Sequence, residues 1–142
     1  MANINLLIDA EFEQIDKLLR KLPSAEKLPF LSEIKLAGVA TYLHNFYNGL
    51  ENILKFCLRI LDVSIGQSAT WHKDLLDSAC QHGIISIKTK TLLAEYLFFR
   101  HFFVNAYAFD LQAEKMENLV KNLSTTFKLF ESEIQAFLKM AK

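Results

Sequence analysis

The chain has 142 residues, of which 51% are hydrophobic, and its 16 basic and 16 acidic side chains give a formal net charge of zero. This length and composition predict one ordinary domain, 1–142, with enough apolar material for a core. The zero charge excludes a protein that binds nucleic acid through bulk positive charge, but not one with a few cations focused in a cleft. No apolar run approaches the roughly 18 residues of a membrane span. The N-terminus also lacks the basic start of a secretory signal, so we expect a cytoplasmic protein.

Helices are predicted along the whole chain, because it holds only four Gly and two Pro and no run alternates with period two. In chain order, we expect five helices over 5–21, 31–63, 70–81, 86–108 and 112–141. The first ends before Pro23, and His82–Gly83 marks the end of the third. Short connections between long helices favour antiparallel neighbours, so we predict an all-α, up-and-down helical bundle.

Several common chemistries lack their residue patterns in this sequence. Cys57 and Cys80 lie among apolar residues without a CxxC spacing, so we expect both to be buried and reduced. No two histidines have metal-ligand spacing, and no phosphate-binding glycine loop or GxSxG occurs. We therefore predict neither a metal site nor a cofactor.

The fourth predicted helix divides into two arcs when each residue advances by about 100°. Its polar arc holds Arg100, His101, Asn105 and Tyr107, interrupted by two aliphatic residues, which is typical of an interface or cleft wall. The opposite face is expected to enter the core through its phenylalanines, namely Phe98, Phe99, Phe102, Phe103 and Phe109.

The second predicted helix offers a matching stripe. Its members recur at i, i+3, i+4 and i+7, and they are His44, Tyr47, Asn48 and Glu51. If the second and fourth helices pack together, Glu51 could hold the Arg100 guanidinium in a fixed orientation. The alternative is that the stripe simply faces solvent.

The histidines differ in how well their positions suit a functional role. His101 is the only one beside the polar arc, so it is a candidate functional residue. We interpret His44 as an exposed or polar-network histidine and His72 as a structural residue beside Trp71 at the start of the third helix.

The segment Arg100-His-Phe-Phe-Val-Asn105-Ala-Tyr107 resembles the RxxxxHxY motif of HepT-like toxins, within the HEPN superfamily of helical ribonucleases. Further blocks appear in the same order as in that family, and the resemblance covers most of the chain. These blocks are YLHNFYNGLENIL, WHKDLL and RHFFVNAYAFDL.

The resemblance implies a homodimer whose motif helices meet at a twofold axis and form a composite ribonuclease cleft. Cleavage in this family is independent of metal: the RNA 2′-hydroxyl attacks the adjacent phosphate. Arg100 matches the arginine that stabilises phosphate charge, and His101 matches the polar residue that often follows it. Tyr107 matches the tyrosine to which the partner, a minimal nucleotidyltransferase antitoxin, can attach AMP.

Asn105 departs from the motif, because the family has its acid–base histidine there. Asparagine cannot exchange a proton near neutral pH, and losing a general acid–base typically costs about 10²–10⁴ in rate. His101 lies only about 40° from Asn105 around the helix, but its position in the family is an orienting one.

The helical geometry favours a dimer independently of the resemblance. Arg100 and Asn105 are about 140° apart, which is too wide for one narrow pocket but suits a twofold interface to which each protomer contributes. Two alternatives remain open at this point. One is a non-catalytic bundle that serves as a nucleotidyltransferase-binding, substrate-binding subunit; the other is a structural bundle whose polar cluster only specifies the dimer.

Overall fold

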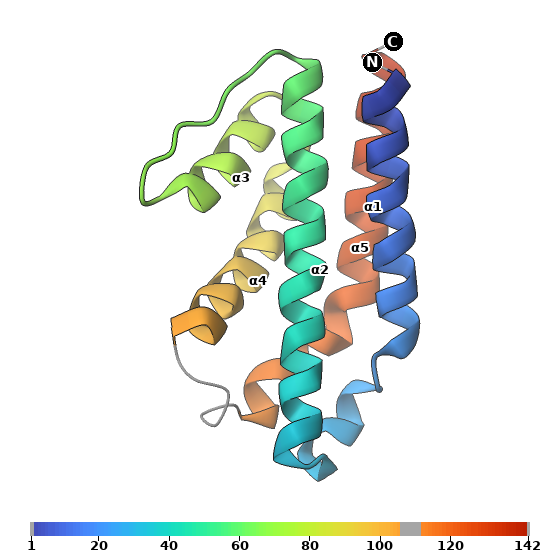
Figure 1. The fold of residues 1–142 in the computed structure, drawn as a ribbon, viewed down its shortest axis with the longest axis vertical. Helices are drawn as coiled ribbons and strands as arrows, with labels where there is room; N and C mark the ends of the chain where they lie inside the picture. Colours follow the sequence, from blue (N-terminus) through green and yellow to red (C-terminus); the bar gives the residue numbers. More distant parts are fainter. Residues whose placement is uncertain (1, 106–111, 142) are drawn as a thin grey trace.

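The structure is a computed structural model, and it describes residues 2–105 and 112–141. Within these residues the chain forms five α-helices and one 3-10 helix, without strands (Figure 1). In chain order these are α1 (Ala2–Lys21), η1 (Ala25–Phe30), α2 (Glu33–Ile60), α3 (Trp71–Gln81), α4 (Ile87–Asn105) and α5 (Ala113–Met140). The predicted all-α bundle is therefore confirmed.

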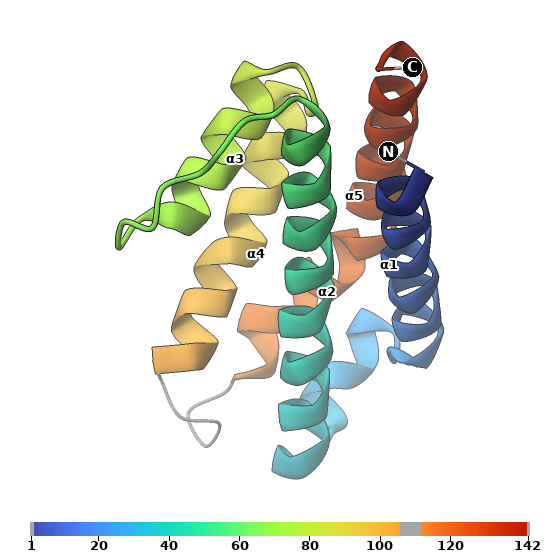
Figure 2. The ribbon, with the colours of Figure 1, turned by 45° about the horizontal axis from the view of Figure 1, so that its top comes forward.

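Helix α2 is the central element of the bundle. Helices α1 and α5 lie on one side of it, and α3 and α4 lie on the other (Figures 1 and 2). The pairs α1–α2, α2–α4 and α4–α5 run antiparallel (Figure 1). The loop 61–70 leaves the end of α2 and runs along the outer side of α3 to its first turn, and α3 is inclined to α2 (Figures 1 and 2).

Local signals in the sequence account for the helix ends. The Ser32 hydroxyl accepts a hydrogen bond from the Lys35 backbone N–H at 3.3 Å and caps the start of α2. Gly83 has a φ of 76°, and the Ile84 backbone N–H donates a hydrogen bond to the Ala79 carbonyl oxygen at 2.9 Å. These two features confirm the predicted end of α3. The segment expected to be a loop after α1 instead forms η1, which buries Leu28.

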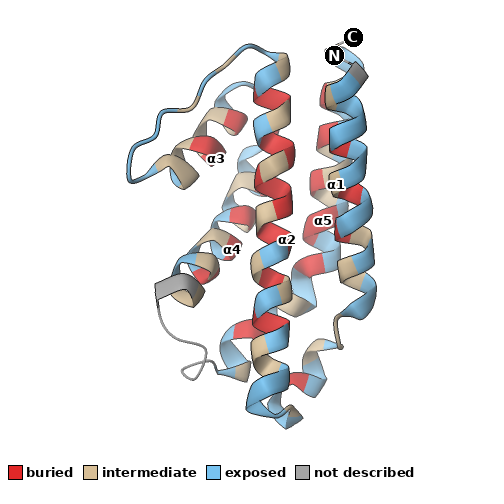
Figure 3. Cartoon of the chain, in the orientation of Figure 1, coloured by how far each residue is buried: buried red, intermediate tan, exposed pale blue. Residues whose placement is uncertain are grey.

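The core is built around α2, which is buried on most of its circumference (Figure 3). On the α1–α5 side the core is aromatic. The ring centroid of Phe12 lies 5.8 Å from that of Phe127 and 6.3 Å from that of Phe130. Cys57 is fully buried as expected, whereas Cys80 is only half-buried. None of the helices that the structure describes combines the length and apolarity needed to cross a membrane.

The buried face of α4 is rotated from the predicted one. Leu93, Tyr96 and Phe99 are buried, but Phe98 is 76% exposed, so its placement in the core was wrong. The physical reason is that α4 packs against three helices, and its contact face follows the spacing of Leu93 and Tyr96 rather than the phenylalanine stripe. This rotation places Arg100 at the edge of the buried face, where it is half-buried. Phe109 lies outside the described residues.

Candidate functional site

The polar stripe of α2 faces α3 and α4 rather than solvent. Tyr47 has an exposed fraction of 0% and Glu51 of 3%, while His44 and Asn48 are half-buried. The alternative of a solvent-facing stripe is therefore wrong. A tyrosine hydroxyl and a carboxylate buried at this depth need specific partners, because desolvated polar groups without them are costly.

Arg100 is fixed to α2 through Asn48. Its Nε donates a hydrogen bond to Asn48 Oδ1 at 2.9 Å, across a sequence separation of 52 residues. The expected partner was Glu51, and that expectation was wrong because the Glu51 carboxylate is engaged elsewhere. An asparagine leaves the arginine charge uncompensated, whereas a carboxylate would neutralise it.

Glu51 is paired with His72, at the start of α3. Its Oε2 lies 2.7 Å from His72 Nδ1, which is a short, charge-assisted contact if the imidazole is protonated. The sequence interpretation of His72 as a structural residue missed this pairing. The partners are 21 positions apart and an irregular loop lies between them, so no helical spacing could have revealed the pairing.

The Tyr47 hydroxyl is influenced by both charged groups. It is fully buried, and its side chain interacts with the Glu51 carboxylate. Burial raises the pKa of Tyr47 well above its usual range, the Glu51 carboxylate raises it further, and the Arg100 charge opposes both. Tyr47 is therefore a neutral O–H group inside the cluster at physiological pH.

His44 also lies near Arg100, whose charge acts on it. Its ring centroid lies 5.5 Å from that of Phe103, and its Nδ1 is buried without a hydrogen-bond partner in the described structure. Burial lowers the pKa of His44, and the Arg100 charge lowers it further. His44 is thus held in the neutral form beside a permanent cation.

A pocket of about 500 Å³ opens between α3 and α4, beside the cluster. It is lined by both His72 and Arg100, and also by His101, which is exposed. Leu97 and Phe98 form part of its apolar wall. The pocket therefore combines a fixed guanidinium, two imidazoles and apolar surface.

The remaining predicted site residues lie at the limit of the described structure. Asn105 is the last residue of α4, and its side chain is not described. Tyr107 lies outside the described residues. Their roles stay predictions.

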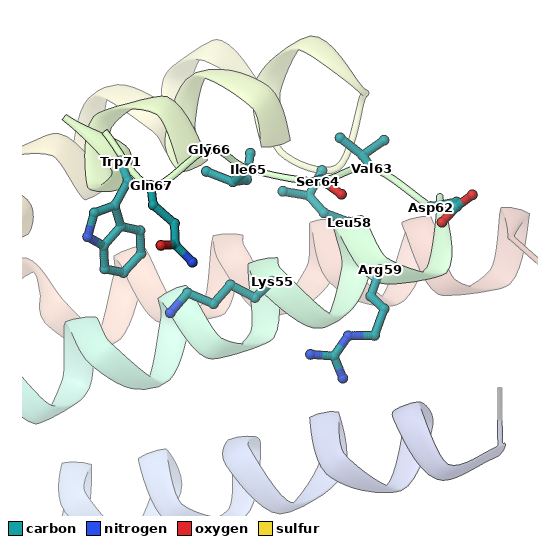
Figure 4. A pocket seen from close by; sticks show the side chains of 10 residues that line it. All are labelled: Lys55, Leu58, Arg59, Asp62, Val63, Ser64, Ile65, Gly66, Gln67 and Trp71. Atoms are coloured by element: carbon teal, nitrogen blue, oxygen red, sulfur yellow. The ribbon is translucent and has the colours of Figure 1, made fainter. Parts of the chain in front are cut away.

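A second pocket, of about 600 Å³, lies between α2 and the loop 61–70 (Figure 4). Lys55 extends from α2 toward Trp71, and its Nζ lies 4.4 Å from the indole ring centroid. Trp71 also adjoins the first site, because the Trp71 and His72 ring centroids are 3.6 Å apart and His72 lines that pocket. One ring of this tilted pair thus lines each pocket.

Within residues 2–105 and 112–141, no group of three or more His, Cys, Asp or Glu side chains is arranged to hold a metal ion. The chemistry that these residues offer is hydrogen bonding, positive charge and proton transfer by imidazole.

A family model described as "HepT-like protein" matches residues 38–141, and the chain belongs to this HepT-like family. The predicted resemblance is therefore confirmed. The matched range contains the whole cluster, from His44 on α2 to Arg100 on α4. Neither a curated protein nor a solved structure matches the chain.

Proposed function

We propose that this HepT-like protein is the toxin component of a toxin–antitoxin pair whose antitoxin is a minimal nucleotidyltransferase. In this proposal the Arg100 site binds an RNA phosphate in a cleft between two copies of the chain. The observation that carries the proposal is the fixed Arg100, which lines a pocket with two histidines.

The hydrogen bonding of Arg100 suits phosphate recognition. Its Nε is occupied by Asn48, and no carboxylate among the described residues forms an ion pair with it. The terminal nitrogens can then donate to phosphate oxygens, for which the planar guanidinium is well matched. Charge accumulates on these oxygens when the 2′-hydroxyl attacks, so the same contacts stabilise the transition state.

An exposed apolar surface on α4 supports the proposed dimer. Phe98 is 76% exposed and lies beside the pocket wall that Leu97 contributes. Phe102 follows one turn later and is half-buried. Large apolar side chains grouped on a surface are typical of protein interfaces. A twofold contact here would bring two Arg100 sites together.

The proposal is tested by incubating the purified protein with RNA and analysing the products by gel electrophoresis. We expect cleavage by the wild-type protein and its loss in Arg100→Ala. Arg20→Ala is the matched control, because Arg20 is an exposed arginine on α1, away from the site. Cleavage that survives Arg100→Ala would contradict the site assignment.

The partner is tested separately through Tyr107. We expect mass spectrometry to show an added AMP on the protein after incubation with ATP and a minimal nucleotidyltransferase encoded beside it. The modification should disappear in Tyr107→Phe. An unmodified Tyr107 in the wild-type protein would contradict this part of the proposal.

Asn105 favours a second candidate function, a non-catalytic subunit that binds a nucleotidyltransferase or its substrate. Under that alternative, the wild-type protein forms a stable complex with the nucleotidyltransferase and does not cleave RNA. Asn105→His discriminates further: faster cleavage than wild type supports a ribonuclease cleft, and no cleavage supports the binding subunit.

A further inference from the structure

We propose that His72, oriented by Glu51, is the proton-transfer residue of this site and performs the role that Asn105 cannot. This inference rests on the proposed ribonuclease function. It assigns a catalytic role to His72 on α3, in contrast to the motif position on α4, and a positioning role to Glu51 on α2.

The Glu51 contact defines which nitrogen of His72 can act. Because Nδ1 lies 2.7 Å from the carboxylate, it carries the hydrogen and donates it to Glu51 Oε2. The lone pair of the neutral ring is then on Nε2, which can accept a proton. A carboxylate that fixes the tautomer and stabilises the imidazolium is the arrangement by which many enzymes activate a histidine base.

Burial of the pair is uneven, and the difference points toward the pocket. Glu51 is 3% exposed, whereas the His72 side chain keeps 22% of its surface exposed and lines the pocket with Arg100. The carboxylate is thus shielded from water while the imidazole reaches the site where substrate would lie. The Trp71 ring, tilted by 30° with its centroid 3.6 Å from that of His72, restricts the imidazole further.

The Tyr47 hydroxyl adds to this arrangement. It is fully buried, and its side chain interacts with the Glu51 carboxylate, the group that contacts His72. A buried carboxylate needs such polar partners, because a desolvated charge without them is costly. Tyr47 therefore helps to hold Glu51 where it orients the imidazole.

The reaction uses these groups as follows. The RNA 2′-oxygen bonds to the adjacent phosphorus while His72 Nε2 takes the 2′-hydroxyl proton, and Arg100 stabilises the charge on the phosphoryl oxygens. The bond from phosphorus to the 5′-oxygen then breaks and leaves a 2′,3′-cyclic phosphate. The leaving 5′-oxygen takes a proton from water, and His72 releases its proton to solvent.

Ionisable groups of both signs surround His72. Glu51 contacts it from α2, and the pocket between α3 and α4 adds further charged or ionisable side chains. These are Lys73, Asp77, Lys90, Arg100 and His101, with Asp77 and Lys90 paired at 2.8 Å. The imidazole acts as the base in its neutral form.

The test measures cleavage of a short RNA by His72→Ala and His72→Gln over a range of pH. We expect both variants to lose at least about 100-fold in rate, the usual effect of removing a general base. The glutamine variant can still hydrogen-bond to Glu51, so it guards against loss of folding. His82→Ala is the matched control, because His82 is an exposed histidine at the end of the same helix.

Two readouts separate proton transfer from a structural role. Added imidazole should restore part of the activity of His72→Ala and none of that of Arg100→Ala. Glu51→Gln keeps an acceptor for Nδ1 but removes the negative charge that stabilises the imidazolium, so kcat should fall while KM stays unchanged.

The outcomes distinguish this inference from the function on which it rests. Cleavage that needs Arg100 but persists in both His72 variants overturns the role of His72 alone. A wild-type protein that binds RNA through Arg100 without cleaving it also overturns that role, while the RNA site stands. Cleavage that is indifferent to Arg100→Ala overturns both.

Discussion

Helix α2 faces an aromatic, apolar environment on one side and a buried polar cluster on the other. Toward α1 and α5, rings such as Phe12, Phe127 and Phe130 fill the space. Toward α3 and α4, the same helix buries Tyr47 and Glu51. Apolar packing on the first side holds the helix in place, and this rigidity lets the second side keep charged groups at fixed positions.

The contrast suggests a division of labour between stability and chemistry. The α1–α5 side should account for most of the stability, because buried aromatic area is strongly stabilising. The α3–α4 side should contribute less per residue, because burying charged and polar groups offsets much of the energy of pairing them.

The largest effect should come from truncating the aromatic side. Phe130 is fully buried, so Phe130→Ala is expected to lower the free energy of unfolding by about 3–5 kcal/mol, measured by urea denaturation. Phe30→Ala is the control, since Phe30 is 88% exposed and its loss should change stability by less than about 0.5 kcal/mol. Similar losses for the two variants would contradict the contrast between the two regions.

The next effect should come from breaking the Glu51–His72 pair. His72→Ala leaves a buried carboxylate without its partner, and we expect a loss of about 1–3 kcal/mol at neutral pH. Thermal or urea unfolding measures this loss of stability, with His82→Ala as the control variant. A variant as stable as wild type would show that the pair adds nothing to stability and would sharpen its assignment to function.

A smaller effect is expected where α4 joins α5. The buried Tyr96 hydroxyl donates to the Leu119 carbonyl oxygen at 2.6 Å. Tyr96→Phe should therefore cost about 1 kcal/mol in urea unfolding, the usual net value of one hydrogen bond. A loss above that of Phe130→Ala would contradict the proposed ranking.

The smallest effect should be the pH dependence contributed by His44. Burial and the Arg100 charge lower its pKa below the ordinary value of 6.5, so the unfolded chain binds this proton more readily. The free energy of unfolding should consequently fall as pH drops below 6.5 and should fall less steeply in His44→Gln. NMR titration of His44 checks the direction, and Arg100→Gln should raise its pKa. A His44 pKa above the ordinary value would contradict this reading of the site.

Local patterns in the sequence predicted the helices and their ends well. The scarcity of Gly and Pro and the His82–Gly83 stop each act within one or two turns, so they can be interpreted without knowing the fold. The segment before α2 was harder, because its two prolines indicate a break but do not exclude the short 3-10 helix that buries Leu28.

The site was only partly predictable, because its contacts depend on how the helices pack and not on local patterns. Helical periodicity grouped Tyr47 with Glu51 and set Arg100 on another helix, but it carries no information on which of these groups meet. The Asn48–Arg100 and Glu51–His72 contacts depend on the rotation of α4 and on the path of the loop 61–70. The phenylalanine pattern of α4 led to a wrong core prediction for the same reason: the rotation of α4 leaves Phe98 on the surface.

The ring that lies against His72 belongs to Trp71, the sole tryptophan of the chain, which also lines the second pocket. Indole fluorescence therefore originates beside the two pockets and nowhere else in the protein. Protonation of the adjacent imidazole would quench this emission, and an occupant of either pocket would alter its wavelength. The protein thus carries a built-in optical reporter, with which ligand binding at the site can be followed without any added label.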